Sequence, residues 1–117
     1  MNLQSRKDQR LKLIRGIILK NSKKYGIKIE RIILFGSRAR GDHKKHSDWD
    51  ILLIIKEKVK QKTLDEFWLQ TKRELIDKGI TPEIIIVSNQ EYLEQKHLTG
   101  YIYYWAEKEG ITIYHSK

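Results

Sequence analysis

The sequence predicts an α+β protein, in which a small mixed β-sheet carries helices packed on one face. Two runs of apolar residues, 32–35 and 51–55, are nearly continuous, as they are in strands at a buried, central position. Segments with helical apolar spacing alternate with such runs in the order α-β-β-α-β-α-α-β. With 117 residues and no internal repeats, the chain is expected to form a single domain, residues 1–117.

The first half of the chain contains a predicted helix and two strands. The helix covers residues 3–24, where apolar positions recur at amphipathic spacing: Leu3, Leu11, Ile14, Ile17 and Ile18. Gly26 ends this helix, since glycine readily adopts the backbone conformation that stops one. The two apolar runs define strands over residues 27–35 and 49–56, and a polar loop, residues 36–47, joins them.

Two capping boxes predict where helices begin in the second half of the chain. Thr63-Leu64-Asp65-Glu66 opens a helix that continues to about Lys78, and Ser88-Asn89-Gln90-Glu91 opens a short one. The remaining predicted elements are a third strand, a last helix ended by a glycine, and a short edge strand, over residues 83–87, 98–108 and 111–114 respectively.

The chain is basic, with a net charge of +9, and the charge is unevenly spread. Residues 1–31 carry ten Lys and Arg against two acids, whereas the rest of the chain is nearly balanced. The first helix therefore presents either an ordinary solvated face or a docking face for an acidic partner or for RNA phosphates.

Composition excludes several classes of protein. Without cysteine, neither a disulfide framework nor a thiolate metal site can form. No apolar run approaches the roughly 20 residues that a membrane span needs. The N-terminus is polar and basic and lacks the apolar stretch of a signal peptide, so we expect a cytoplasmic protein.

The most informative pattern is Gly36-Ser37 after the first strand, with Asp48 and Asp50 at the start of the second. Because alternate strand residues point the same way, the two carboxylates should aim at one spot, with Cα atoms about 6.6 Å apart. Carboxylates bind hard cations such as Mg²⁺. A Gly-Ser turn offers backbone N–H groups and a hydroxyl to phosphate oxygens. The pattern predicts a site for a metal-bound nucleoside triphosphate.

The segment Gly36-Ser37-Arg38-Ala39-Arg40-Gly41, followed by Ser47-Asp48-Trp49-Asp50, resembles the minimal nucleotidyltransferases of the DNA polymerase beta-like superfamily. The resemblance extends from Ile29 to Tyr114, and this motif is its specific part. It implies a polymerase beta-like nucleotidyltransferase fold, with Asp48 and Asp50 as catalytic residues and ligands of two Mg²⁺ ions, and ATP as the substrate. In the resembling family, such a protein is the antitoxin of a helical HEPN toxin and transfers AMP to a toxin tyrosine.

The resemblance also implies a third carboxylate on a neighbouring strand, where the family usually has aspartate. Glu83 is the only acid at the start of the third predicted strand, and it is the candidate for a metal ligand and general base. Glutamate is one methylene longer than aspartate, which can weaken the activity. The same resemblance places phosphate binding at Gly36 and Ser37 and at one or both arginines, with Arg40 expected nearer the phosphate than Arg38.

The histidines of the loop and the aromatic residues of the chain are expected to have structural or surface roles and no part in catalysis. His43 and His46 could suggest zinc, but without further soft ligands they are better explained as solvated loop residues. Trp49, between the two aspartates, should point to the opposite sheet face and pack in the core. Four aromatic residues of the last predicted helix span most of its circumference: Tyr101, Tyr103, Tyr104 and Trp105. Some of them are therefore expected to pack in the core, and the others to contact another protein.

Three functions are compatible with these features. The favoured one is transfer of AMP from ATP to a partner HEPN protein, which would supply the missing wall of the cleft in so short a chain. The second is a nucleotide-binding or steric antitoxin without turnover. The third is addition of nucleotides to RNA ends, which we rank lowest because no RNA-binding motif is visible. The exposed aromatic residues are also compatible with a homo-oligomer.

Overall fold

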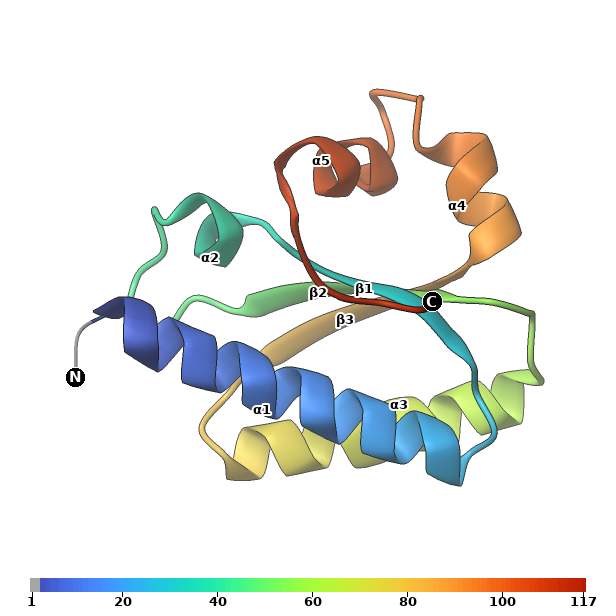
Figure 1. Cartoon of the computed structure of the whole chain (residues 1–117), viewed down its shortest axis with the longest axis horizontal. Helices are drawn as coiled ribbons and strands as arrows, with labels where there is room; N and C mark the ends of the chain where they lie inside the picture. Colours follow the sequence, from blue (N-terminus) through green and yellow to red (C-terminus); the bar gives the residue numbers. More distant parts are fainter. Residues whose placement is uncertain (1–2) are drawn as a thin grey trace.

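A four-stranded mixed β-sheet forms the centre of the molecule, and the computed structural model describes residues 3–117 (Figure 1). The strand order is β3-β2-β1-β4. In chain order the elements are α1 (Leu3–Lys24), β1 (Ile29–Phe35), α2 (Ser37–Arg40), β2 (Trp49–Ile55), α3 (Gln61–Asp77), β3 (Pro82–Ser88), α4 (Asn89–Gln95), α5 (Ile102–Glu109) and β4 (Ile111–His115). The predicted α+β class with a mixed sheet is confirmed. The side chain of Leu3, one of the predicted apolar positions, lies outside the described residues.

The pairing of the strands gathers the motif residues at one corner of the sheet. β1 pairs antiparallel with β2 and β4, and β2 pairs in parallel with β3. A parallel pair needs a long connection across the sheet, and here it contains α3. The register sets Asp50 opposite Phe35 on one side and opposite Glu83 on the other. The end of β1 and the starts of β2 and β3 therefore meet.

Helices cover both faces of the sheet, so the prediction of helices on one face is wrong. α1 and α3 pack on one face, and α4 and α5 on the other (Figure 1). Alternate residues of β2 divide between two apolar cores. Ile51 and Leu53 face the α1–α3 layer, whereas Leu52 and Ile54 face the α4–α5 layer. The nearly continuous apolar runs have this cause, because both sides of a strand buried between two layers must be apolar.

Two predicted helix starts and one predicted loop need correction. α3 begins at Gln61, two residues before the predicted cap, and Thr63 lies inside the helix instead of capping it. The last predicted helix begins at Ile102 instead of residue 98, because residues 98–101 form turns. The predicted loop over residues 36–47 contains the single-turn helix α2. The second capping box is confirmed, since the Ser88 hydroxyl accepts a hydrogen bond from the Glu91 backbone N–H at 3.2 Å.

A polar contact joins the α4–α5 layer to the sheet. The buried Tyr92 hydroxyl of α4 donates a hydrogen bond to the Glu107 carboxylate of α5. The same carboxylate accepts a hydrogen bond from Arg31 Nη1 of β1 at 2.9 Å. One carboxylate therefore connects two helices and a strand. Within residues 3–117, none of the helices combines the length and apolar character that a membrane span requires.

Candidate active site

Gly36 makes the sharp turn between β1 and α2, and its lack of a side chain leaves room for Asp50. Its φ of 73° is in the left-handed region, which favours glycine. A Cβ built at this position would overlap the Asp50 carboxylate. The turn and the second motif aspartate are therefore in direct apposition, as the Gly-Ser and Asp-x-Asp pattern predicts.

Asp50 lies at the centre of an acidic cluster. It projects from the start of β2 on the face covered by α4 and α5, opposite to its neighbour Trp49. Burial is the main cause that raises the pKa of Asp50, and the negative charges of Asp48 and Glu83 add to it. The ionised form of Asp50 is thus less favourable than that of an exposed aspartate, and a bound cation would offset this difference.

The three predicted carboxylates are near enough for their charges to interact, but their side chains do not converge as a preformed metal site. Glu83 is exposed and stands beside Asp50 in the β2–β3 register, and Asp48 is exposed just before β2. Within residues 3–117, no three acidic or histidine side chains converge as a ready set of metal ligands. The chemistry of the cluster, with Asp50 half-buried among like charges, nevertheless fits a hard divalent cation. Metal binding by these residues remains a prediction.

Arg40 is the cation associated with the acidic cluster. Its positive charge lowers the pKa of Asp50 and so opposes the effect of burial and of the two acids. Its guanidinium is held by Asp42, at 3.3 Å from Nε, and by Glu109, at 3.7 Å from Nη1. Glu109 was missed by sequence reasoning, because it comes from the end of α5 and only the tertiary fold brings it to this loop.

Arg38 organises the loop that carries Asp48. Its Nη2 donates hydrogen bonds to the backbone carbonyls of Ser47, at 3.0 Å, and Lys45, at 3.2 Å. Its guanidinium also stacks over the Trp49 ring, 4.5 Å from the ring centre. Arg38 thus lies on the Trp49 side of the loop, whereas the charge of Arg40 reaches Asp50. That Arg40 lies nearer the phosphate than Arg38 stays a prediction.

The start of α2 presents the groups that could contact phosphate. The first N–H groups of any helix have no partner within the helix, and in α2 these belong to Ser37 and Arg38, the first two of its four residues. Gly36 accepts the turn-closing hydrogen bonds of this helix, since its carbonyl receives the N–H of Ala39 and of Arg40, both at 3.1 Å. The turn therefore holds Ser37 beside the acidic cluster, and its role with phosphate stays a prediction.

The remaining sequence predictions concern His43, His46 and the aromatic residues. Trp49 is only 3% exposed and packs in the α1–α3 core, as predicted. Both histidines are exposed loop residues, and they belong to no group of metal ligands within residues 3–117. In α5 and the turn before it, Tyr103 packs against Tyr92, whereas Tyr101 and Trp105 are each 47% exposed.

Comparison with known proteins identifies the class to which this fold and motif belong. The model of the nucleotidyltransferase domain family matches residues 12–112, and the chain belongs to that family. A curated relative from Methanocaldococcus jannaschii is named Putative protein adenylyltransferase MJ0141. It is 51% identical over 41 residues, which cover 32% of this chain and 41% of the relative. The matched segment thus spans less than half of that protein's length.

Solved structures show the same fold at low sequence identity. One is a chain of a toxin–antitoxin crystallised with AMP-PNP, with a TM-score of 0.56 and 16% identity over 87% of this chain and 73% of that chain. Another belongs to the tri-AMPylated HEPN toxin of Shewanella oneidensis in complex with an MNT antitoxin. Its TM-score is 0.53, with 15% identity over 91% of this chain and 73% of that chain. The predicted resemblance to nucleotidyltransferases is confirmed.

Proposed function

We propose that this nucleotidyltransferase moves AMP from ATP to a hydroxyl group of a partner protein, and that the partner is a HEPN-type toxin. One observation carries the proposal. Asp50 lies half-buried against Gly36 and between two further acids, Asp48 and Glu83, at the corner where three strands meet. The protein adenylyltransferase name of the archaeal relative supports the same reaction.

Asp48 and Asp50 are the residues that would hold Mg²⁺, with Glu83 as the third ligand. Divalent ions at such a site neutralise the phosphate charge and stabilise the negative charge that develops during the transfer. The raised pKa of Asp50 supports this assignment, because a cation would remove the unfavourable repulsion within the cluster. Bound to these residues, the ions would also offset the negative charge that otherwise repels a triphosphate.

Ser37 and Arg40 would orient the triphosphate. Backbone N–H groups at the start of α2 and the Ser37 hydroxyl are donors for phosphate oxygens, and Gly36 allows the backbone to approach closely. Arg40 can use its guanidinium for the same anion, since its side chain is 46% exposed and its charge already acts on Asp50.

The transfer itself exchanges a phosphoanhydride bond of ATP for a phosphate ester bond to the acceptor. The acceptor hydroxyl oxygen forms a bond to the α-phosphorus of ATP, and the bond from that phosphorus to the β-phosphate oxygen breaks. Pyrophosphate leaves with the bonding electrons, and the hydroxyl proton passes to a carboxylate. Glu83 is the group we assign to this proton, because it is exposed at the start of β3 and stands directly beside Asp50.

The exposed apolar surface of the α4–α5 layer supports a protein acceptor. It consists of residues that are 40–49% exposed although they are large and hydrophobic: Leu93, Leu98, Tyr101, Ile102 and Trp105. The layer covers the same sheet face from which Asp50 projects. A partner docked there would be close to the acidic cluster and could complete the cleft.

The test is transfer of label from ATP, labelled at its α-phosphate, to the purified product of the neighbouring gene as the candidate partner. With Mg²⁺ we expect label on the partner, and with Asp48→Asn or Asp50→Asn we expect none. Asp77→Asn removes an exposed carboxylate of α3 and serves as the matched control. Equal labelling by the wild type and by both active-site variants would refute the proposal.

A second candidate function is nucleotide binding without turnover. Glu83 favours it, because a longer side chain at the third acidic position changes where the carboxylate oxygen lies. Calorimetry separates the two functions, since binding of Mg²⁺ and ATP without any consumption of ATP in the presence of the partner would indicate a binding module.

A further inference from the structure

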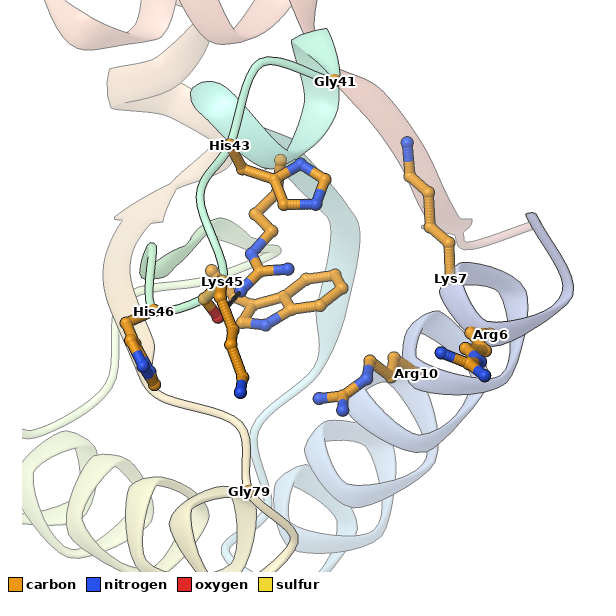
Figure 2. Close-up of a pocket in the computed structure, with 10 residues that line it drawn as sticks. Arg6, Lys7, Arg10, Gly41, His43, Lys45, His46 and Gly79 are labelled. Atoms are coloured by element: carbon orange, nitrogen blue, oxygen red, sulfur yellow. Dashed lines mark hydrogen bonds between the residues drawn. The ribbon is translucent and has the colours of Figure 1, made fainter. Parts of the chain in front are cut away.

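A pocket lies on the other side of the motif loop from the acidic cluster. It has a volume of about 690 Å³ and is bounded by the first turns of α1 and by residues 41–46 (Figure 2). Arg38, Trp49 and Gly79, which follows α3, complete its lining. Because Trp49 and Asp50 are consecutive residues of β2, this pocket and the acidic cluster open on opposite faces of the sheet.

The pocket is lined by cations and by no acid. Five of its lining side chains are basic: Arg6, Lys7, Arg10, Arg38 and Lys45. Figure 2 shows Arg10 reaching from α1 and Lys45 reaching from the loop into the same space. Among the ion pairs of the part of the chain that the structure describes, none involves these five side chains. The pocket thus has a concentrated positive charge without a carboxylate in its wall.

Arg38 anchors this positive charge in a fixed position. Its hydrogen bonds to the Lys45 and Ser47 carbonyls and its stacking on Trp49 hold the guanidinium against the pocket wall. Burial, and next the charge of Arg10, lower the pKa of Arg38, so the two guanidinium groups act on each other. Like charges held this close favour the binding of an anion between them.

We propose that this pocket binds a compact polyphosphate, a small molecule with two or more linked phosphate groups. Its volume lies within the range of small-molecule sites, about 300–1,000 Å³. Guanidinium groups match phosphate oxygens with paired hydrogen bonds, and lysine adds a mobile point charge. Cations from both walls could contact different phosphate groups of one molecule.

The pocket suits a compact anion better than a nucleic-acid strand. Proteins that hold single strands combine basic residues with exposed aromatic rings on which bases stack. The indole ring in this pocket belongs to Trp49, which is buried and already covered by Arg38, and the other rings of the lining are the imidazoles of His43 and His46. The exposed aromatic residues lie instead on and just before α5, on the other face of the sheet. The site therefore offers phosphate groups five cations, whereas bases find no tyrosine or tryptophan ring exposed among its described lining residues.

The test is calorimetric titration of inorganic triphosphate into the full chain in the presence of EDTA. Without divalent metal, the acidic cluster repels an anion, so binding reports the basic pocket whether or not the proposed function is correct. The variant R10Q/K45Q removes one cation from each wall, and K12Q/K58Q removes the same charge from exposed positions outside the pocket. We expect affinity about tenfold lower or more in the first variant and a change within about twofold in the second.

Further measurements keep the proposal falsifiable if the double variant does not fold. In the wild-type protein, NMR shifts caused by triphosphate should centre on residues 6–10 and 41–46, and the signals of Ser37 and Glu83 beside the acidic cluster should stay in place. A second titration uses ATP in EDTA. If ATP and triphosphate bind with equal affinity, the ligand is the polyphosphate itself. If ATP binds more tightly and R10Q/K45Q weakens this binding, the ligand is a nucleotide, and both outcomes support the proposal. The proposal would be overturned if triphosphate did not bind, or if both double variants lost the same affinity for it. It would also be overturned if an RNA lacking terminal phosphates bound more tightly than triphosphate through the same residues.

Discussion

The carboxylate of Asp50 occupies the space in which any residue other than glycine at position 36 would carry its Cβ. This contact joins the two halves of the motif, which are separated in sequence by the polar loop. It also ties the position of the central acid to the backbone of the turn that would hold phosphate. The contact can be tested separately from the left-handed conformation of the glycine.

The substitution Gly36→Ala should abolish nucleotidyl transfer and also destabilise the fold. The new methyl group would displace Asp50, and the φ of 73° adds backbone strain of about 1 kcal/mol. Gly26→Ala is the matched control, since Gly26 has a φ of 69° but nothing within 4 Å of the added Cβ. We expect the control to carry the strain of a positive φ and to retain activity. Equal activity in both variants would contradict the role of the contact.

The substitution Asp50→Asn should raise the melting temperature at pH 7 in the absence of metal. The pKa of Asp50 is raised in the folded state, so the folded protein binds this proton more tightly than the unfolded chain does. Stability therefore falls as the pH rises from the ordinary aspartate pKa through the raised one. The difference between variant and wild type should vanish near about pH 3, where the carboxylate is protonated in both states. Thermal unfolding between about pH 3 and pH 7 measures this difference in melting temperature, and Asp77→Asn serves as the control.

Arg38→Lys should lower transfer activity by about ten- to a hundredfold although the charge is kept. Lysine cannot make the paired hydrogen bonds to the Ser47 and Lys45 carbonyls or stack as guanidinium does on Trp49. The loop that carries Asp48 would then lose its fixed position, and small misplacements have effects of this size. Arg73→Lys, at an exposed position of α3, is the control. Initial rates of labelling at saturating ATP provide the measurement.

Tyr92→Phe should reduce the free energy of unfolding by about 1 kcal/mol, which is typical of one lost hydrogen bond. The Tyr92 hydroxyl is buried and donates to Glu107, which also binds Arg31. Tyr101→Phe removes a hydroxyl from an exposed residue and should have little effect. Urea unfolding of both variants compares them directly. A larger loss in Tyr101→Phe than in Tyr92→Phe would contradict this account of the contact.

The sequence predicted the strands and the motif well, because both depend on local patterns. Apolar runs located β1 and β2 to within two residues, and the Ser88 hydroxyl caps α4 as the capping box indicates. The helix start predicted from the Thr63 capping box is wrong, because α3 begins at Gln61 and has no side-chain cap. Packing, and not the local cap, decides such a boundary.

Features that depend on the meeting of distant segments could not be predicted in this way. The second helical layer follows from the same apolar runs, but the sequence does not say which helix covers which face. The contact of Arg40 with Glu109 and the basic pocket between α1 and the motif loop both join segments that are far apart in the chain. Their residues, taken singly, look like ordinary solvated charges.

The adjacency of Trp49 and Asp50 has a consequence for sequence change in this protein. Side chains alternate along a strand, so a shift of β2 by one residue would exchange its two faces. The Trp49 indole would then point toward the face of the acidic cluster, and the Asp50 carboxylate into the apolar α1–α3 core. Insertions or deletions confined to residues 42–46 leave that alternation intact, since the loop is solvent-exposed there. Length variants among descendants of this gene should therefore accumulate ahead of Ser47 and be absent between Asp48 and Ile55.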